Sequence, residues 1–159
     1  MSKIVKWFPT EILHGDVMPW YGCVVEGTRW LILPGMTGRG PDMKQEYPEM
    51  LEQDDFDSGD QARLVACPHS IEEQTVLILE KIKKALHENG TNFENVFLCD
   101  YFITDMANWP DCFRTMKKWF EKESPEWLEH QRPSVLSIVH GLDHPDMLVE
   151  LRMWATLPE

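Results

Sequence analysis

Hydrophobic positions in the middle of the chain recur with the period of a helix. From Ile71 to Glu88, apolar side chains return every three or four residues, as expected for one buried helical face. Ser70 and Glu73 form a capping-box signature at the start of this stretch. Asn89-Gly90 at its end is a typical helix stop. The pattern predicts a helix over Ile71 to Glu88.

A second helix is predicted further along the chain. Pro110 suits its first turn, because proline lacks the N–H that a first turn leaves unpaired. Ser124-Pro125-Glu126 ends it. Its apolar stripe consists of Phe113, Met116, Trp119 and Phe120.

Short runs rich in β-branched and aromatic residues predict strands on both sides of the helices. The triplet Glu26-Gly27-Thr28 has the composition of a hairpin turn, so the second and third runs are predicted to pair with each other. Between Gly35 and Pro68 the composition shifts to Gly, Pro, Asp, Glu and Gln, which predicts a long irregular insertion. The runs are Ile4 to Phe8, Tyr21 to Val25, Arg29 to Leu33, Val96 to Thr104, Ser134 to Val139 and Met147 to Ala155.

The order β-β-β-α-β-α-β-β predicts an α+β fold with a single, mainly antiparallel six-stranded sheet and both helices on one face. One domain over residues 1–159 is expected, with an irregular insertion at about 36–69. In the last run, alternate residues point to opposite faces, and each face receives large apolar groups. A sheet with one uncovered apolar face predicts an oligomer.

Composition excludes several classes of partner. The chain has 27 acidic and 15 basic residues, a net charge of −12, which disfavours nucleic acid and anionic membranes. No run approaches the roughly 20 apolar residues of a bilayer span, and the polar N-terminus, broken by Pro9, does not resemble a signal peptide. The four cysteines are widely spaced without a CxxC pair, which indicates reduced thiols. A cytoplasmic protein is expected.

Two charged residues stand in or beside the last two predicted strands. Arg132 opens the run Arg132-Pro133-Ser134-Val135, and Glu150 lies inside the final run together with Arg152. Both Arg132 and Glu150 are costly to bury, so they are candidates for a functional site. A guanidinium group can hold a carboxylate through two parallel hydrogen bonds, and a carboxylate can position water or move a proton.

Much of the chain resembles the reactive-intermediate deaminase family, the Rid or YjgF group. The similar stretches are SIEEQTVLILEKIKKALHENGTNFENVFLCDYFITDM, NWPDCFRTMKKWFEK, QRPSVLSIV and LVELRMWATLP, together with the spacing from Tyr21 to Gly35 in LPGMTG. The resemblance implies a chorismate-mutase-like subunit, a homotrimer and a cleft at each subunit interface. It also implies hydrolysis of carboxylated enamines or imines, such as 2-aminoacrylate or 2-aminomuconate, to a 2-keto acid and ammonia. No cofactor and no metal are implied.

The resemblance also implies roles for individual residues. Arg132 matches the arginine that binds the substrate carboxylate, and Glu150 matches the acidic residue near the attacking water. Two departures indicate an altered pocket: Pro133 replaces a small polar residue, and Phe113 stands where short members often carry Asn. The residues expected to contact substrate are Tyr21, Gly35, Met36, Phe113 and Ser134.

Simpler interpretations stay open for these residues. Arg132 could form an interfacial salt bridge, Glu150 could pair with Arg152, and Tyr21 could be ordinary strand packing. The tryptophans Trp20, Trp109 and Trp127 could shape an enlarged cleft for an aromatic-derived or unsaturated substrate, or serve as core anchors.

Other features of the chain are better explained without a ligand. His140 and His144 sit in a polar turn that needs no metal, and the acidic run Asp54 to Asp60 lacks the spacing of a calcium loop. Two alternative functions remain, a non-catalytic metabolite-binding trimer and, less favoured because of the acidity, an endoribonuclease.

Overall fold

The computed structural model describes residues 3–9, 21–38, 67–130, 132–143 and 145–158. The acidic run Asp54 to Asp60, Trp20, His144 and most of the predicted insertion lie outside the described residues. Three short 3-10 turns join the main elements: η1 (Phe93–Asn95), η2 (Met106–Asn108) and η3 (Pro125–Glu129). The strands and helices are β1 (Lys3–Pro9), β2 (Tyr21–Glu26), β3 (Trp30–Ile32), β4 (Met36–Thr37), α3 (Ile71–Glu88), β5 (Val96–Ile103), α4 (Trp109–Glu123), β6 (Ser134–Ile138) and β7 (Val149–Thr156).

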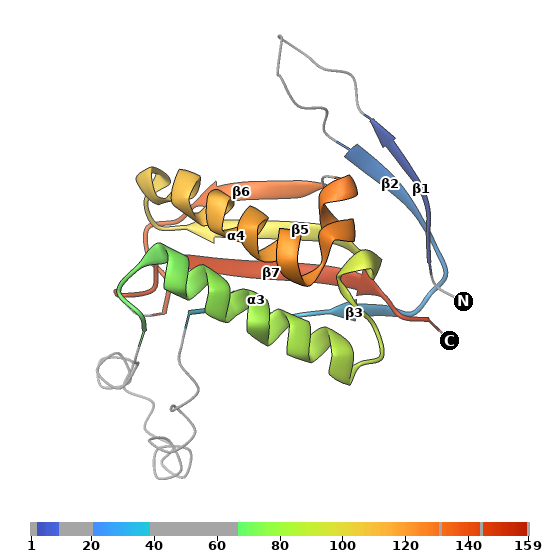
Figure 1. The fold of residues 1–159 in the computed structure, drawn as a ribbon, viewed down its shortest axis with the longest axis horizontal. Coiled ribbons are helices and arrows are strands. Elements are labelled where there is room, and N and C mark those ends of the chain that lie inside the picture. Colours follow the sequence, from blue (N-terminus) through green and yellow to red (C-terminus); the bar gives the residue numbers. More distant parts are fainter. Residues whose placement is uncertain (1–2, 10–20, 39–66, 131, 144, 159) are drawn as a thin grey trace.

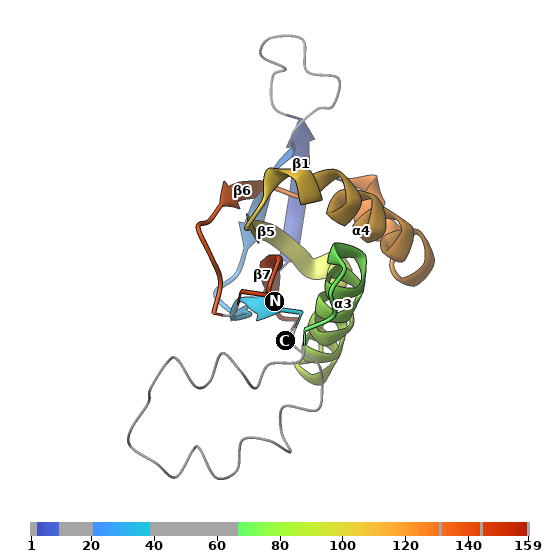
Figure 2. The same cartoon turned by 90° about the vertical axis from the view of Figure 1, so that its left-hand side faces the viewer.

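Both helices pack on one face of a five-stranded sheet (Figure 1), and the side view shows the opposite face without a helix (Figure 2). The strand order is β3-β7-β5-β6, with β4 also beside β7. Along β7 the predicted alternation is confirmed. Its helix-facing residues are at most 1% exposed, and they are Met147, Val149, Leu151, Met153 and Ala155. The α+β class and the position of the helices are therefore as predicted.

The expected single six-stranded sheet is not formed by the described residues. Strands β1 and β2 pair only with each other, as a separate two-stranded sheet that stands apart from the larger one (Figure 1). Within the larger sheet, β5 and β6 run parallel. The parallel pair follows from α4, because a helical crossover returns the chain to the same end of the sheet before the next strand starts.

The predicted hairpin between the second and third strands is wrong. β2 pairs with β1, whereas β3 pairs with β7, more than a hundred residues away. Gly27, with φ of 104°, does make a tight turn, but the turn redirects the chain from one sheet to the other. Turn chemistry sets where the chain bends, and the choice of partner depends on which distant strand offers a matching edge.

Helix α3 has the predicted ends and holds the adjacent loops through Gln74. Its N-cap is Ser70, whose hydroxyl accepts from the Glu73 amide at 3.1 Å. The fully buried Gln74 donates to the Pro68 and Asp146 carbonyls at 2.7 and 2.6 Å. Its carbonyl accepts from the Leu148 amide at 2.9 Å. One amide therefore ties the start of α3 to the turn before β7.

Helix α4 carries the aromatic part of the core. Its buried residues are Cys112, Met116, Trp119 and Phe120, whereas Phe113, expected on the same stripe, is 38% exposed. Phe113 lies one position after Cys112 and so turns toward the edge of the interface with the sheet. No helix in the described part of the chain is both long and apolar enough to cross a membrane.

Candidate functional site

The guanidinium group of Arg132 is held by backbone carbonyl groups. Its Nη1 donates to the carbonyl oxygens of Trp127 at 2.5 Å and His130 at 2.6 Å. Its Nε donates to Val96 at 3.2 Å, and Nη2 donates to Phe93 at 3.4 Å. With 4% of its surface exposed, Arg132 is fixed just before β6 begins. These contacts give it a structural role whatever else it binds.

Trp127 of η3 contributes a second kind of contact to Arg132. The guanidinium carbon lies 4.3 Å from the centre of the indole ring, which is within cation–π distance. Phe120 at the end of α4 stacks on the same indole with centroids 4.4 Å apart. Burial lowers the pKa of Arg132 to about 10, so the group still carries its charge at neutral pH. A fixed positive charge therefore stands beside an aromatic stack.

A cavity of about 340 Å³ lies between α4 and the strands β5 and β6. Three residues named from the sequence line it: Arg132, Ser134 and Phe113. Among the described lining residues, the charged ones are Lys117 and Arg132, and no carboxylate is present. The rest of the lining is largely aromatic or aliphatic and consists of Tyr101, Trp109, Met116, Phe120, Trp127, Leu128 and Leu136. We call this space the α4 cavity.

Most of the α4 cavity lining was missed by sequence reasoning, although a signal was present. Trp109, Met116, Lys117 and Phe120 follow one another at helical spacings around Phe113, so one face of α4 presents them all. Trp109 and Trp127, which the sequence offers as cleft residues, do line the cavity. The strand contributions could not be read from the sequence, because they depend on the parallel pairing of β5 with β6.

Glu150 lies in a different place, on the sheet face away from the helices. Its carboxyl group covers Gly35, where an added Cβ would come within 2.5 Å of Glu150 Cδ. Met36, the next residue, lies in β4 and pairs with Leu151 of β7. Burial, reinforced by Asp143, raises the pKa of Glu150. Gly35, Met36 and Glu150 thus form a second group, in which the absence of a side chain at Gly35 leaves room for the Glu150 carboxyl group.

Arg152 pairs with a residue that the sequence did not suggest. Its Nη2 and Nε donate to the same Asp100 oxygen at 2.5 and 3.2 Å. Asp100 lies directly opposite Arg152 in the antiparallel register of β5 and β7. In the described structure, Arg152 therefore forms a cross-strand pair with Asp100 and not the alternative pair with Glu150, and it lowers the pKa of Glu150 only through its charge.

Within one copy of the chain, the residues of the α4 cavity and the group around Glu150 lie apart. Ser134 is level with Cys99 on β5, whereas Glu150 is level with Phe102. Three residues of strand separate these levels, roughly 10 Å, and the Glu150 side chain is on the opposite face from the α4 cavity. Tyr21 begins β2, opposite Pro9, in the separate two-stranded sheet.

The two buried cysteines, Cys99 and Cys112, are not activated nucleophiles. All four lie in the described part of the chain, and none forms a disulfide. Burial raises the pKa of Cys99 to about 12 and also raises the pKa of Cys112. Both side chains stay protonated thiols at neutral pH, as expected for packed cysteines.

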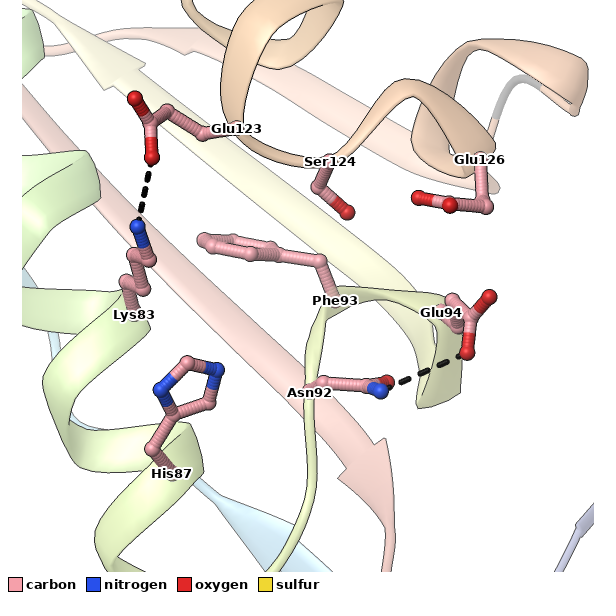
Figure 3. Close-up of a pocket in the computed structure, with 8 residues that line it drawn as sticks. All are labelled: Lys83, His87, Asn92, Phe93, Glu94, Glu123, Ser124 and Glu126. Carbon is pink, nitrogen blue, oxygen red and sulfur yellow. Dashed lines mark hydrogen bonds and ion pairs between the residues drawn. The ribbon is translucent and has the colours of Figure 1, made fainter.

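A second, polar cavity of about 290 Å³ lies between the end of α3 and the end of α4 (Figure 3). It contains none of the site residues expected from the sequence. Lys83 pairs with Glu123 across it at 2.6 Å, and hydrogen bonds from Lys122 and Lys83 lower the pKa of Glu123 to about 2. Lys83, the lysine of this lining, is already paired with Glu123, so we assign no ligand to this cavity.

Known structures share this fold at low sequence identity. A YjgF/UK114 family member from Mycobacterium tuberculosis is 20% identical with a TM-score of 0.55, over 84% of this chain and 83% of that one. A Rid-family protein of unknown function from Yersinia pestis is 18% identical with a TM-score of 0.59, over 84% of each chain. Yeast Mmf1 is 14% identical with a TM-score of 0.59, over 96% of this chain and all of that one.

Sequence comparison gives the family directly. No curated protein sequence matches the chain. The sequence pattern of the family described as Endoribonuclease L-PSP matches residues 25–157, which include both helices and the strands β3 to β7. The chain therefore belongs to the L-PSP family, the YjgF or Rid group.

Proposed function

We propose that the protein hydrolyses small carboxylated enamines or imines, of the 2-aminoacrylate or 2-aminomuconate type, to the 2-keto acid and ammonia. The observation that carries this proposal is the α4 cavity, where Arg132, Ser134 and Phe113 line a space whose charged groups are cationic. A carboxylate entering this space meets positive charge and no acidic neighbour in the described lining. Membership of the Rid group supports the same chemistry.

Arg132 would bind the carboxylate through Nη2, the guanidinium nitrogen with the longest hydrogen bond. The Nη2–Phe93 contact of 3.4 Å is longer than an ordinary hydrogen bond, whereas both Nη1 contacts are short. A substrate oxygen could replace the Phe93 carbonyl at Nη2 while Nη1 keeps the side chain in place. Charge-assisted hydrogen bonds of this kind are stronger than those between neutral groups.

Proton transfers make up the rest of the reaction. The enamine tautomerises to the imine, water adds to the C=N carbon, and the carbinolamine collapses to the ketone as ammonia leaves. Glu150 is the proposed group for these transfers. Its pKa is raised, so it lies nearer to neutral pH than the pKa of an exposed carboxyl group. No cofactor takes part in this sequence.

The proposal requires more than one copy of the chain, because Arg132 and Glu150 lie apart within one. We propose a homotrimer whose interface is the uncovered sheet face and continues around β6, the edge strand of this sheet in the described residues, so that Glu150 of the partner subunit approaches Arg132 from that edge. Trp30, Ile32 and Val135 are exposed large hydrophobic residues on strands of this sheet. Trp154, opposite Ile32, belongs to the same uncovered face. Apolar surface of this kind is commonly buried between subunits.

The direct test is ammonia release from 2-aminoacrylate generated in situ. Arg132→Met and Glu150→Gln are expected to lose most activity under conditions where circular dichroism shows them folded. Arg114→Met is the matched control, because Arg114 lies on α4 with its side chain 65% exposed and pairs with Asp111 outside the α4 cavity. Full activity in folded Arg132→Met would contradict the proposed binding of the substrate carboxylate by Arg132. Absence of turnover despite keto-acid binding would favour the non-catalytic alternative.

A second candidate function comes from the description of the family as an endoribonuclease. The net charge of −12 opposes it, because RNA binding relies on basic surfaces. RNA cleavage that follows the protein through successive purification steps and disappears in Glu150→Gln would support this candidate. Cleavage that separates from the protein would dismiss it.

A further inference from the structure

The α4 cavity is larger and more aromatic than a three-carbon substrate needs. Its volume of about 340 Å³ falls in the range of about 300–1,000 Å³ typical of sites for much larger ligands. Five aromatic side chains line it: Tyr101, Trp109, Phe113, Phe120 and Trp127. A molecule the size of 2-aminoacrylate would leave most of these rings without a contact.

The rings are arranged along the length of α4. Trp109 contacts both Tyr101 and Phe113 near the start of α4, with ring centroids 5.1 Å apart for Tyr101–Trp109 and 5.8 Å for Trp109–Phe113. Phe120 and Trp127 stack near its end. Seven residues from Phe113 to Phe120 correspond to roughly 10 Å of helix, so the aromatic lining extends over about two turns of α4.

Two positive charges stand among these rings, on Arg132 and Lys117. Arg132 stands beside Trp127, 4.3 Å from its ring centre. Lys117 adds a second positive charge on the exposed side of α4. A ligand that fits has one carboxylate for the arginine and a planar apolar body for the rings. Offset or edge contacts with such a body are favourable for aromatic side chains.

We propose that the α4 cavity selects 2-imino acids whose side chain carries an aromatic ring, over aliphatic ones. This inference rests on the proposed deaminase function for its chemistry, and on the cavity alone for its selectivity. Aromatic 2-keto acids, the products of the reaction, bind the same cavity through the same carboxylate and ring contacts.

The binding test uses phenylpyruvate and pyruvate with the full chain in titration calorimetry. Phenylpyruvate is expected to bind at least about tenfold more tightly, because its ring fills the part of the cavity that pyruvate leaves empty. Equal affinities would overturn the proposal.

A matched pair of variants locates the site. Lys117→Glu reverses a charge that lines the cavity, whereas Lys118→Glu reverses the neighbouring exposed lysine, which does not line it. Lys117→Glu is expected to weaken phenylpyruvate binding about fivefold and Lys118→Glu to leave it unchanged, since a charge acts strongly only at short range. Equal effects of the two changes would place the ligand elsewhere and overturn the proposal.

A turnover comparison separates this inference from the proposed function. Imines generated in situ from phenylalanine and from alanine by an amino-acid oxidase are the two substrates. A higher kcat/KM for the phenylalanine-derived imine supports both ideas. Faster turnover of the alanine-derived imine overturns the selectivity and keeps the deaminase. Tight phenylpyruvate binding without turnover of either imine overturns the deaminase and keeps the aromatic-acid site.

Discussion

Replacing Arg132 with methionine tests whether its carbonyl contacts hold the fold together. Methionine keeps an unbranched chain but removes donors to four carbonyl groups and the contact with Trp127. A hydrogen bond to a charged group contributes about 1.5–3 kcal/mol, and a desolvated cation–π contact about 2 kcal/mol. Part of this is offset because the buried charge is also removed.

The net loss expected for Arg132→Met is about 3–5 kcal/mol, comparable to breaking a buried charged network. The free energy of unfolding of a small domain is about 5–15 kcal/mol, so the variant should still fold but with much reduced stability. Arg132→Lys should be intermediate, since an ammonium group keeps the charge but cannot reach carbonyl groups in several directions. Arg114→Met, an exposed position, should change stability by less than about 0.5 kcal/mol.

The assay is urea unfolding followed by tryptophan fluorescence at a fixed protomer concentration, because assembly would make stability depend on concentration. A loss below about 1 kcal/mol for Arg132→Met would refute the reasoning. It would mean that the contacts with the carbonyl groups and Trp127 do no more than balance the cost of burying the charge. In that case the arginine would serve ligand binding without serving the fold.

Three further predictions concern other parts of the structure. Gln74→Leu leaves three backbone groups without their buried partner and should cost about 3–5 kcal/mol in urea unfolding; a loss under about 1 kcal/mol would contradict the bonding described. The pKa of Glu150 is raised in the folded state, so ionisation opposes folding as pH rises through and above the usual carboxyl range. Glu150→Gln should therefore be more stable than the unsubstituted protein at pH 7. This difference in stability should disappear below pH 4.5, the ordinary pKa of a glutamate side chain; a higher stability of the variant that persists in acid would point to another cause. Gly35→Ala should displace the Glu150 carboxyl group and lower the proposed deaminase activity with the thermal unfolding midpoint little changed, whereas unaltered activity would contradict a role of Glu150 in the reaction.

The sequence could predict those features that depend on near neighbours along the chain. Helix α3 begins and ends where its cap residues indicated, because capping involves groups within four residues of each other. The two faces of β7 followed from strict alternation. Arg132 and Glu150 were identifiable as costly charges, and Phe113 and Ser134, named from the family resemblance, lie in the same cavity as Arg132.

Only the tertiary structure decided which distant groups meet. β2 pairs with β1 and not with β3, and Arg152 pairs with Asp100, because strand register places residues opposite one another regardless of sequence separation. The carbonyl groups that hold Arg132 come partly from the loop and strand before α4. The sequence by itself therefore determined the helices, the faces and the candidate charges. The packing of α4 over the parallel pair β5–β6 decided the shape and the positive charge of the cavity, since these arise from segments that are neighbours only after folding.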